Sequence, residues 1–235
     1  MLSVSFPLRS AKGVLAVLML SLLAGCGTSA HRLAAIPPDP QGLPDRVELK
    51  AVPVFRGNAY QSGPGALASM LANHKVGTTP GLLEKNLQLP GAEAQLEQNL
   101  QRVAREYGFV VYPLDQNFRA LMTQVAAGYP VLVRFSEGAV LWKEPRYAVL
   151  KGYDRYRDVV ILQAGMNPRQ TMSFSSFTSA WADAGHWAVL VQGARQLPAK
   201  VDQQRWLQAA DELSRAGQEQ AAGEARKALT RQAGQ

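Results

Sequence analysis

The sequence predicts an α+β domain in which helices come first along the chain and an antiparallel sheet follows. Apolar residues recur at helical spacing over much of residues 64–127. Short runs rich in β-branched and aromatic residues dominate from residue 109 onward. The turn-like hexapeptide at 153–158 separates two of these runs, as expected for an antiparallel hairpin. Helices and strands that are gathered in different parts of a chain indicate the α+β class.

Four helices are expected in the first half of the chain. Pro64 suits the first turn of the first helix, where its missing N–H is not needed. Thr79 is a candidate N-cap for the second helix, and Gly108 is placed to end the third. The expected spans are 64–75, 79–84, 93–107 and 116–127.

Five strands and one further helix are expected after residue 108. The expected strands are 109–112, 131–135, 147–153, 159–162 and 187–191. The strands at 147–153 and 159–162 should pair with each other as an antiparallel hairpin. Phe174, Phe177 and Trp181 lie at helical spacing and mark a helix before the last strand.

The composition shifts after Pro198 to Ala, Gln, Glu and Arg. Two short helices are expected there, at 203–215 and 218–231, with a break near Gly217. The pair resembles one tetratricopeptide-type helical hairpin. A single unit cannot form a stacked array, so the pair should pack on the main domain, cap another surface or stay mobile.

The N-terminus has the order of a secretory signal peptide. Arg9 and Lys12 precede an apolar run over 13–23, and small residues follow at Ala24 and Gly25. The run is too short to cross a hydrocarbon core as a helix, which takes about 20 residues. Residues 1–25 are therefore expected to be removed.

The segment Leu23-Ala24-Gly25-Cys26 resembles the lipobox of bacterial lipoproteins. This resemblance implies that Cys26 is acylated and becomes the first mature residue. Gly27 in the next position is similar to the outer-membrane sorting pattern. We therefore expect a protein of the cell envelope, lipid-anchored at the outer membrane and facing the periplasm. An ordinary signal peptide followed by a chance cysteine is the alternative.

These expectations divide the chain into four parts. Residues 1–25 are the signal peptide, and residues 26–46, rich in Pro, Gly and small side chains, form a lipidated tether. The main domain covers 47–198, and the helical pair covers 199–235.

Charge and residue usage exclude several functions. The chain has 25 Lys and Arg against 18 Asp and Glu, a net charge of +7. Its basic residues between 143 and 157 are interleaved with acidic ones and lack stacked aromatics, so we expect no nucleic-acid partner. Three scattered histidines and a single cysteine give no metal-ligand spacing. No glycine-rich phosphate loop follows a strand, so no cofactor is expected.

One segment carries a resemblance to a known family. Residues 60–68, Tyr-Gln-Ser-Gly-Pro-Gly-Ala-Leu-Ala, resemble the start of papain-like cysteine peptidases of the bacteriocin double-glycine leader peptidase type. Further segments at 128–133, 147–154 and 172–187 resemble later parts of the same family, so the likeness covers roughly residues 50–195. It implies a papain-like fold for the main domain. Envelope members of this family commonly continue into tetratricopeptide repeats.

The resemblance also implies that the family's chemistry is lost. Such a peptidase needs a thiolate, a histidine base, a side chain that orients the base, and a donor for the oxyanion. Ser62 stands at the position of the cysteine, and Arg146 at that of the histidine. The oxyanion glutamine falls near Gly57, and the orienting side chain falls on Gln163 or Ala164.

A serine mechanism would need a general base near Ser62. His31 lies in the tether, and His74 is twelve residues along the same helix, about 18 Å away at 1.5 Å per residue. His186, at the start of the last strand, is more typical of a structural residue. Arg146 cannot act as a base, because its guanidinium stays protonated.

Three hypotheses follow. The first is a catalytically inactive envelope module that binds or scaffolds a peptide or protein partner, with Ser62 and Arg146 as binding candidates in a cationic cleft. The second is an active hydrolase that uses Ser62 and an unrecognised base. The third is a structural adaptor that acts through the C-terminal helices. In a plainer interpretation Ser62 is an N-cap worth about 1 kcal/mol, and Arg146 is a surface strand residue.

Overall fold

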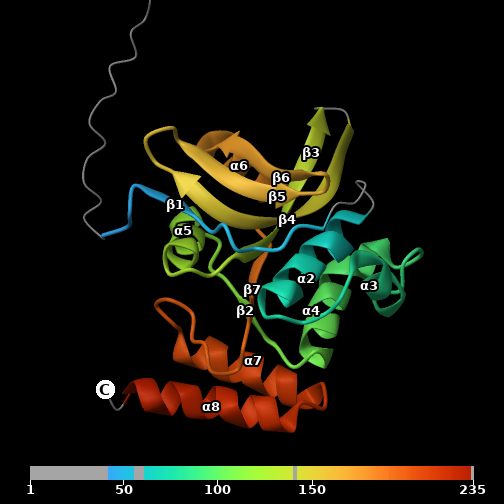
Figure 1. Ribbon diagram of the computed structural model, residues 1–235, viewed down its shortest axis with the longest axis vertical. Helices are drawn as coiled ribbons and strands as arrows, with labels where there is room; N and C mark the ends of the chain where they lie inside the picture. The colour runs from blue at the N-terminus through green and yellow to red at the C-terminus, as the bar shows by residue number, and fades with distance from the viewer. Residues whose placement is uncertain (1–41, 56–60, 140–141, 234–235) are drawn as a thin grey trace, which may run out of the picture. The chain divides into compact units, whose positions relative to one another are not determined.

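The computed structural model describes residues 42–55, 61–139 and 142–233. The signal peptide, Cys26, most of the tether and Gly57 lie outside these ranges. The described residues form a seven-stranded antiparallel sheet with helices on both faces, so the α+β class is confirmed (Figure 1). None of the described helices is long and apolar enough to cross a membrane.

The strand order in the sheet is β2-β7-β3-β4-β5-β6, and β1 pairs with β4 beside this path. The strands are β1 (Arg46–Glu48), β2 (Val110–Pro113), β3 (Val131–Ala139), β4 (Trp142–Asp154), β5 (Val159–Ala164), β6 (Asn167–Ser173) and β7 (Ala188–Gln192). β4 is the longest strand. Its first part pairs with β3, and its last part pairs with both β1 and β5.

The five expected strands all form, and β4 and β5 pair as expected, with Asp154 opposite Val159. β3 and β4 are longer than the expected 131–135 and 147–153, because the polar residues beyond them continue the ladder and place Glu137 opposite Glu144. β1 and β6 were not expected. β1 has only three residues and β6 is mainly polar, so neither carries the apolar alternation of a half-buried strand.

The helices are α2 (Ser62–Asn73), α3 (Pro80–Asn86), α4 (Leu96–Glu106), α5 (Phe118–Ala126), α6 (Phe174–Asp183), α7 (Gln203–Arg215) and α8 (Glu219–Ala233), with a 3-10 turn at Glu93–Gln95. Thr79 is confirmed as the N-cap of α3, where its side chain accepts a hydrogen bond from Leu82 N. Ser62 as an N-cap is wrong. Gln61 precedes α2 without a capping side-chain bond, and Ser62 is already in the helix.

The helices form two layers that cover opposite faces of the sheet (Figure 1). Alternate residues of β3 point to opposite faces, so Val133 packs in one core cluster and Leu132 in the other. Helices α2, α3 and α4 bury their apolar residues on the Leu132 face. Helices α5 and α6, with α7 and α8, do so on the Val133 face.

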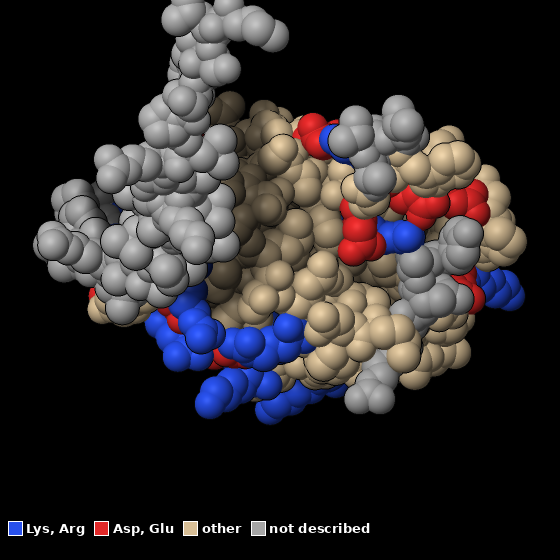
Figure 2. Space-filling view, turned by 90° about the horizontal axis from the view of Figure 1, so that it is seen from above, with Lys and Arg blue, Asp and Glu red and all other residues tan. Residues whose placement is uncertain are grey.

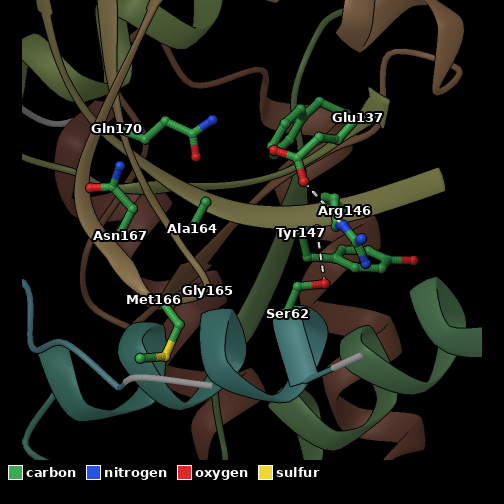
Figure 3. Close-up of a pocket in the computed structure, with 10 residues that line it drawn as sticks. Ser62, Glu137, Arg146, Tyr147, Ala164, Gly165, Met166, Asn167 and Gln170 are labelled. Carbon is green, nitrogen blue, oxygen red and sulfur yellow. Dashed lines mark hydrogen bonds and ion pairs between the residues drawn. The ribbon is translucent and has the colours of Figure 1, made fainter. Parts of the chain in front are cut away.

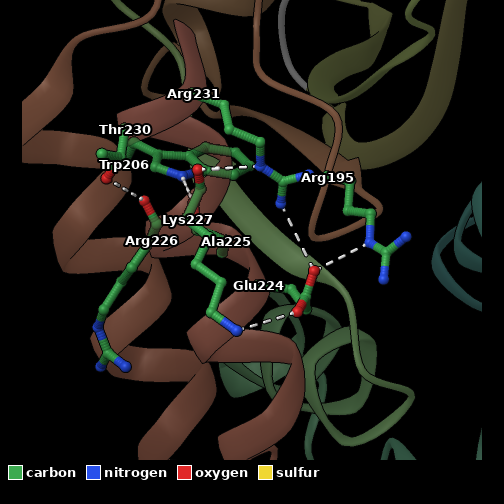
Figure 4. Close-up of polar contacts among 8 residues, drawn as sticks. All are labelled: Arg195, Trp206, Glu224, Ala225, Arg226, Lys227, Thr230 and Arg231. Atoms are coloured by element: carbon green, nitrogen blue, oxygen red, sulfur yellow. Dashed lines mark hydrogen bonds and ion pairs between the residues drawn. The ribbon is translucent and has the colours of Figure 1, made fainter. Parts of the chain in front are cut away.

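The C-terminal helices share the core of the main domain. The predicted break is confirmed at Gly217, which has a φ of +81°. Trp206 on α7 is fully buried in the same core cluster as Tyr112, and its indole N–H donates to Ala225 O at 2.9 Å (Figure 4). Arg205 on α7 is ion-paired with Asp115 at 2.6 Å. Of the three arrangements considered for this pair, packing on the rest of the domain is the one observed.

A second set of contacts holds the outer helix. Glu224 on α8 is ion-paired with Arg195, which precedes α7, at 3.0 Å (Figure 4). Lys227 and Arg231 lie 3.5 and 3.6 Å from the same carboxylate. The positive charge of Arg195, and then that of Lys227, lowers the pKa of Glu224.

Trp206→Ala should lower the free energy of unfolding by about 3–5 kcal/mol, because it leaves a large cavity in a shared core. Leu207→Ala on the same helix is the matched control, since Leu207 is 40% exposed. Its loss should stay below about 1 kcal/mol. Urea unfolding that shows equal, small losses for both variants would contradict the shared core.

Candidate functional site

The N-terminus of α2 lies directly against β4. The Tyr147 amide donates to Ser62 Oγ at 3.4 Å across 85 residues of sequence. A Cβ atom on Gly63 would lie 3.0 Å from Leu96 Cδ2 and 3.5 Å from Tyr147 Cδ2. Glycine therefore permits the close approach, and the approach turns the Ser62 hydroxyl toward the strand instead of toward the helix amides.

A cavity of about 250 Å³ opens beside this contact (Figure 3). It brings together Ser62, Arg146 and Ala164, three positions that the family resemblance singled out from separate segments. The full lining is Ser62, Phe135, Glu137, Arg146, Tyr147, Ala164, Gly165, Met166, Asn167 and Gln170. None of these described residues is a cysteine or a histidine. Three positions that are far apart in the sequence therefore line one cavity.

Arg146 does not make the cavity cationic. Its Nε lies 3.2 Å from Glu137 Oε2, and its Nη2 lies 2.8 Å from Glu144 Oε2. One guanidinium thus faces two carboxylates, and the expectation of a cationic cleft is wrong. Arg146 lies inside β4, which starts at Trp142.

Sequence reasoning missed the two glutamates. Glu144 and Arg146 are two residues apart on one strand, so their side chains share a face of the sheet. Glu137 reaches the same face because it lies opposite Glu144 in the β3–β4 ladder. The i, i+2 spacing of Glu144 and Arg146 could therefore have been recognised in the sequence. The pairing of Arg146 with Glu137 could not, because it depends on a β3–β4 hairpin that is longer than the sequence predicted.

A much smaller cavity, about 10 Å³, also adjoins Ser62 and has room for about one water molecule. Gln163 lines it and is only 4% exposed. Gln163 Nε2 donates to Pro53 O at 2.9 Å and to Ser69 Oγ at 2.8 Å. Gln163 Oε1 has no hydrogen-bond partner among the described residues. Gln163 and Ala164 were the two candidates for the orienting position. Gln163 is held by its hydrogen bonds to Pro53 and Ser69. Ala164 lines the larger cavity.

The two described histidines are engaged elsewhere. His74 caps the far end of α2, and its Nε2 lies 2.8 Å from Val191 O. His186 precedes β7 with a left-handed φ of +56°, and its ring lies edge-on to Trp181 at a centroid distance of 4.7 Å. Neither lines the cavity at Ser62. Among the described residues there is also no group of three or more His, Cys, Asp or Glu that could hold a metal ion.

Tyr147 is the remaining titratable group at the cavity. Burial, with a smaller contribution from the negative charge of Glu97, raises the pKa of Tyr147 to about 12. Its ring lies edge-on to Trp187 at 5.8 Å, and its hydroxyl points away from Ser62 (Figure 3). The phenol is therefore neutral at ordinary pH and does not supply a base to Ser62.

Charge is unevenly distributed on the face seen in Figure 2. Basic side chains gather along one edge, and acidic side chains are grouped on its other half, where only a few basic atoms are visible. Such a face has no uniform positive potential.

No family model matches the chain. No curated protein sequence matches it either. Solved structures that are similar to it include the following two. A putative C39-like peptidase from Bacillus anthracis shares 14% identity with a TM-score of 0.49, over 63% of this chain and 98% of that one. The peptidase domain of Streptococcus ComA, a bi-functional ABC transporter involved in a quorum sensing pathway, shares 18% identity with a TM-score of 0.43, over 59% and 96%. Neither likeness assigns an activity to the chain.

Tyr147→Phe should reduce the loss of stability at alkaline pH. The folded-state pKa is about 12, and the unfolded value is about 10. The folded protein thus binds more protons between these values, and its stability falls as pH rises above about 10. At pH 11 the wild type should have lost about 1.4 kcal/mol more than the variant, each relative to pH 8. Urea unfolding at pH 8 and pH 11 measures these losses. If the wild type and the variant lose the same stability between the two pH values, the burial of this phenol is contradicted.

Proposed function

We propose that this protein is a catalytically inactive relative of the double-glycine leader peptidases, which binds a peptide or protein partner in the cell envelope. The observation that carries the proposal is the cavity at the start of α2. Ser62, Arg146 and Ala164, which the family resemblance singled out, all line this cavity, and Arg146 is ion-paired with Glu137 and Glu144. These are the positions that the resemblance assigns to a peptidase's catalytic groups, and in this chain they carry different side chains.

Inactivity is supported by the residues that could serve as nucleophile and base. The only thiol of the chain is at Cys26, at the expected lipidation site. His74 and His186 are engaged with Val191 and Trp181. A guanidinium cannot accept a proton at any working pH, so Arg146 cannot replace a histidine base.

Binding is supported by the size and lining of the cavity. Its volume of about 250 Å³ suits one or two side chains of a peptide more than a large ligand, since drug-sized ligands occupy roughly 300–1,000 Å³. Phe135, Tyr147 and Met166 supply apolar surface, and Asn167 and Gln170 supply amide groups. Apolar walls with a few polar groups are typical of binding sites.

The proposal of inactivity is tested with peptides that carry a double-glycine leader. The full-length chain and Ser62→Ala should both leave these peptides uncut, as followed by mass spectrometry. Cleavage by the wild type that is lost in Ser62→Ala would overturn the proposal and favour a hydrolase. Cleavage that is equal in both would point to a contaminating protease.

The proposed lipid anchor at Cys26 is tested separately. Cys26→Ala should abolish incorporation of a labelled fatty acid and partition into the detergent phase, because no other thiol is present to be acylated. Thr28→Ala, two residues away, is the matched control and should retain both. Labelling that survives in Cys26→Ala would exclude this anchor.

A further inference from the structure

At the larger cavity, two carboxylates face one guanidinium: Glu137 lines the cavity, and Glu144 contacts Arg146 without lining it. Glu137 and Glu144 provide four carboxylate oxygens, and Arg146 Nε and Nη2 engage one oxygen of each. Glu144 Oε1 accepts only a 3.4 Å bond from Trp142 Nε1. This excess of negative charge lies at the larger cavity, which Glu137 lines directly.

The smaller cavity adds a buried acceptor. Gln163 is held by two hydrogen bonds from its Nε2, so its amide cannot turn over without breaking both of them. Among the described residues its Oε1 therefore has no hydrogen-bond partner, and Gln163 is only 4% exposed. Leaving a buried carbonyl unpaired is unfavourable. A water molecule or a ligand N–H beside Ser62 would relieve this.

We infer that the site selects a peptide segment that carries a lysine or arginine side chain. The cationic head lies at Glu137 and Glu144, and an N–H of the same peptide donates to Gln163 Oε1. This inference rests on the proposed function, because it names the chemistry of the peptide that the cavity would hold.

The shape of the larger cavity suits a long basic side chain. Glu137 and Arg146 lie on one side, and Asn167 and Gln170 lie on the other, with Ala164 between them (Figure 3). The alanine and the neighbouring Gly165 leave space that larger residues would fill.

The methylene stem of a lysine or arginine packs on apolar surface such as that of Phe135 and Met166, while its charged head reaches the carboxylates.

The same charges disfavour an acidic ligand. A peptide carboxylate would compete with Glu137 and Glu144 for Arg146 and would face both of them as like charges. Like-charge contacts are an effective way to reject a wrong partner. The helix dipole of α2 attracts negative charge at Ser62, which lines both cavities, so Glu137 and Glu144 act against this attraction.

The test is affinity selection from a random heptapeptide library by the full-length chain in detergent micelles, read by sequencing. Lysine and arginine should be enriched, and aspartate and glutamate depleted. For a selected peptide, Glu137→Gln should weaken binding about three- to tenfold, a modest range because Glu137 is half exposed. Replacing the peptide's basic residue with norleucine should weaken binding to the wild type similarly and remove the effect of Glu137→Gln.

Glu106→Gln is the matched control. Glu106 is also an exposed glutamate ion-paired with an arginine, Arg102, at 2.6 Å, but it does not line the cavity. It should leave binding unchanged. Selected peptides without a preference for basic residues, or with a preference for acidic ones, would overturn the inference while leaving peptide binding in place. A library with no selected peptides would overturn both.

Discussion

The contact between the first turn of α2 and β4 is the constraint on which the rest of the site depends. Gly63 lets the helix approach until a side chain there would press on Leu96 and Tyr147. The approach aligns Ser62 with the Tyr147 amide and seals Leu67 and Leu71 of α2 into the core below the sheet. Two cavities lie at this contact, and Ser62 lines both of them. A larger residue at position 63 would therefore affect both packing and binding.

The side chains at the contact between α2 and β4 determine the chemistry of the cleft. In a working peptidase of the proposed relationship, the strand beside the helix would present an imidazole. Here it presents Arg146, whose charge is offset by Glu137 and Glu144 from the same hairpin. Ion pairs on a half-exposed hairpin add little stability, so their main consequence is electrostatic: they set which ligand charge the cavity accepts. On the opposite face of the sheet, Trp206 fixes the C-terminal helices to the same core.

Much of the fold could be predicted from the sequence, because strong apolar periodicity marks the helices and the buried strands. The short β1 and the polar β6 lack that signal, and they form because β4 and β5 offer them partners. The candidate site could be predicted only in part. The motifs singled out Ser62, Arg146 and Ala164, which line one cavity in the structure. The pairing of Arg146 with Glu137 depends on a nine-residue β3, which a polar sequence does not reveal. The N-cap prediction for Ser62 failed because Gln61 occupies the N-cap position and Ser62 is the first residue of α2.

Hydrogen exchange read by mass spectrometry, with and without a lysine-containing heptapeptide, tests the central claim most directly, because one experiment reports both binding and cleavage. With the peptide present, backbone amides at 61–66, 135–139 and 142–147 should exchange more slowly, and the mass of the peptide should stay unchanged. A peptide cut into fragments would contradict the claim that the cleft only binds. Slower exchange confined to 203–231, with none at the cleft, would place the interaction on the C-terminal helices instead.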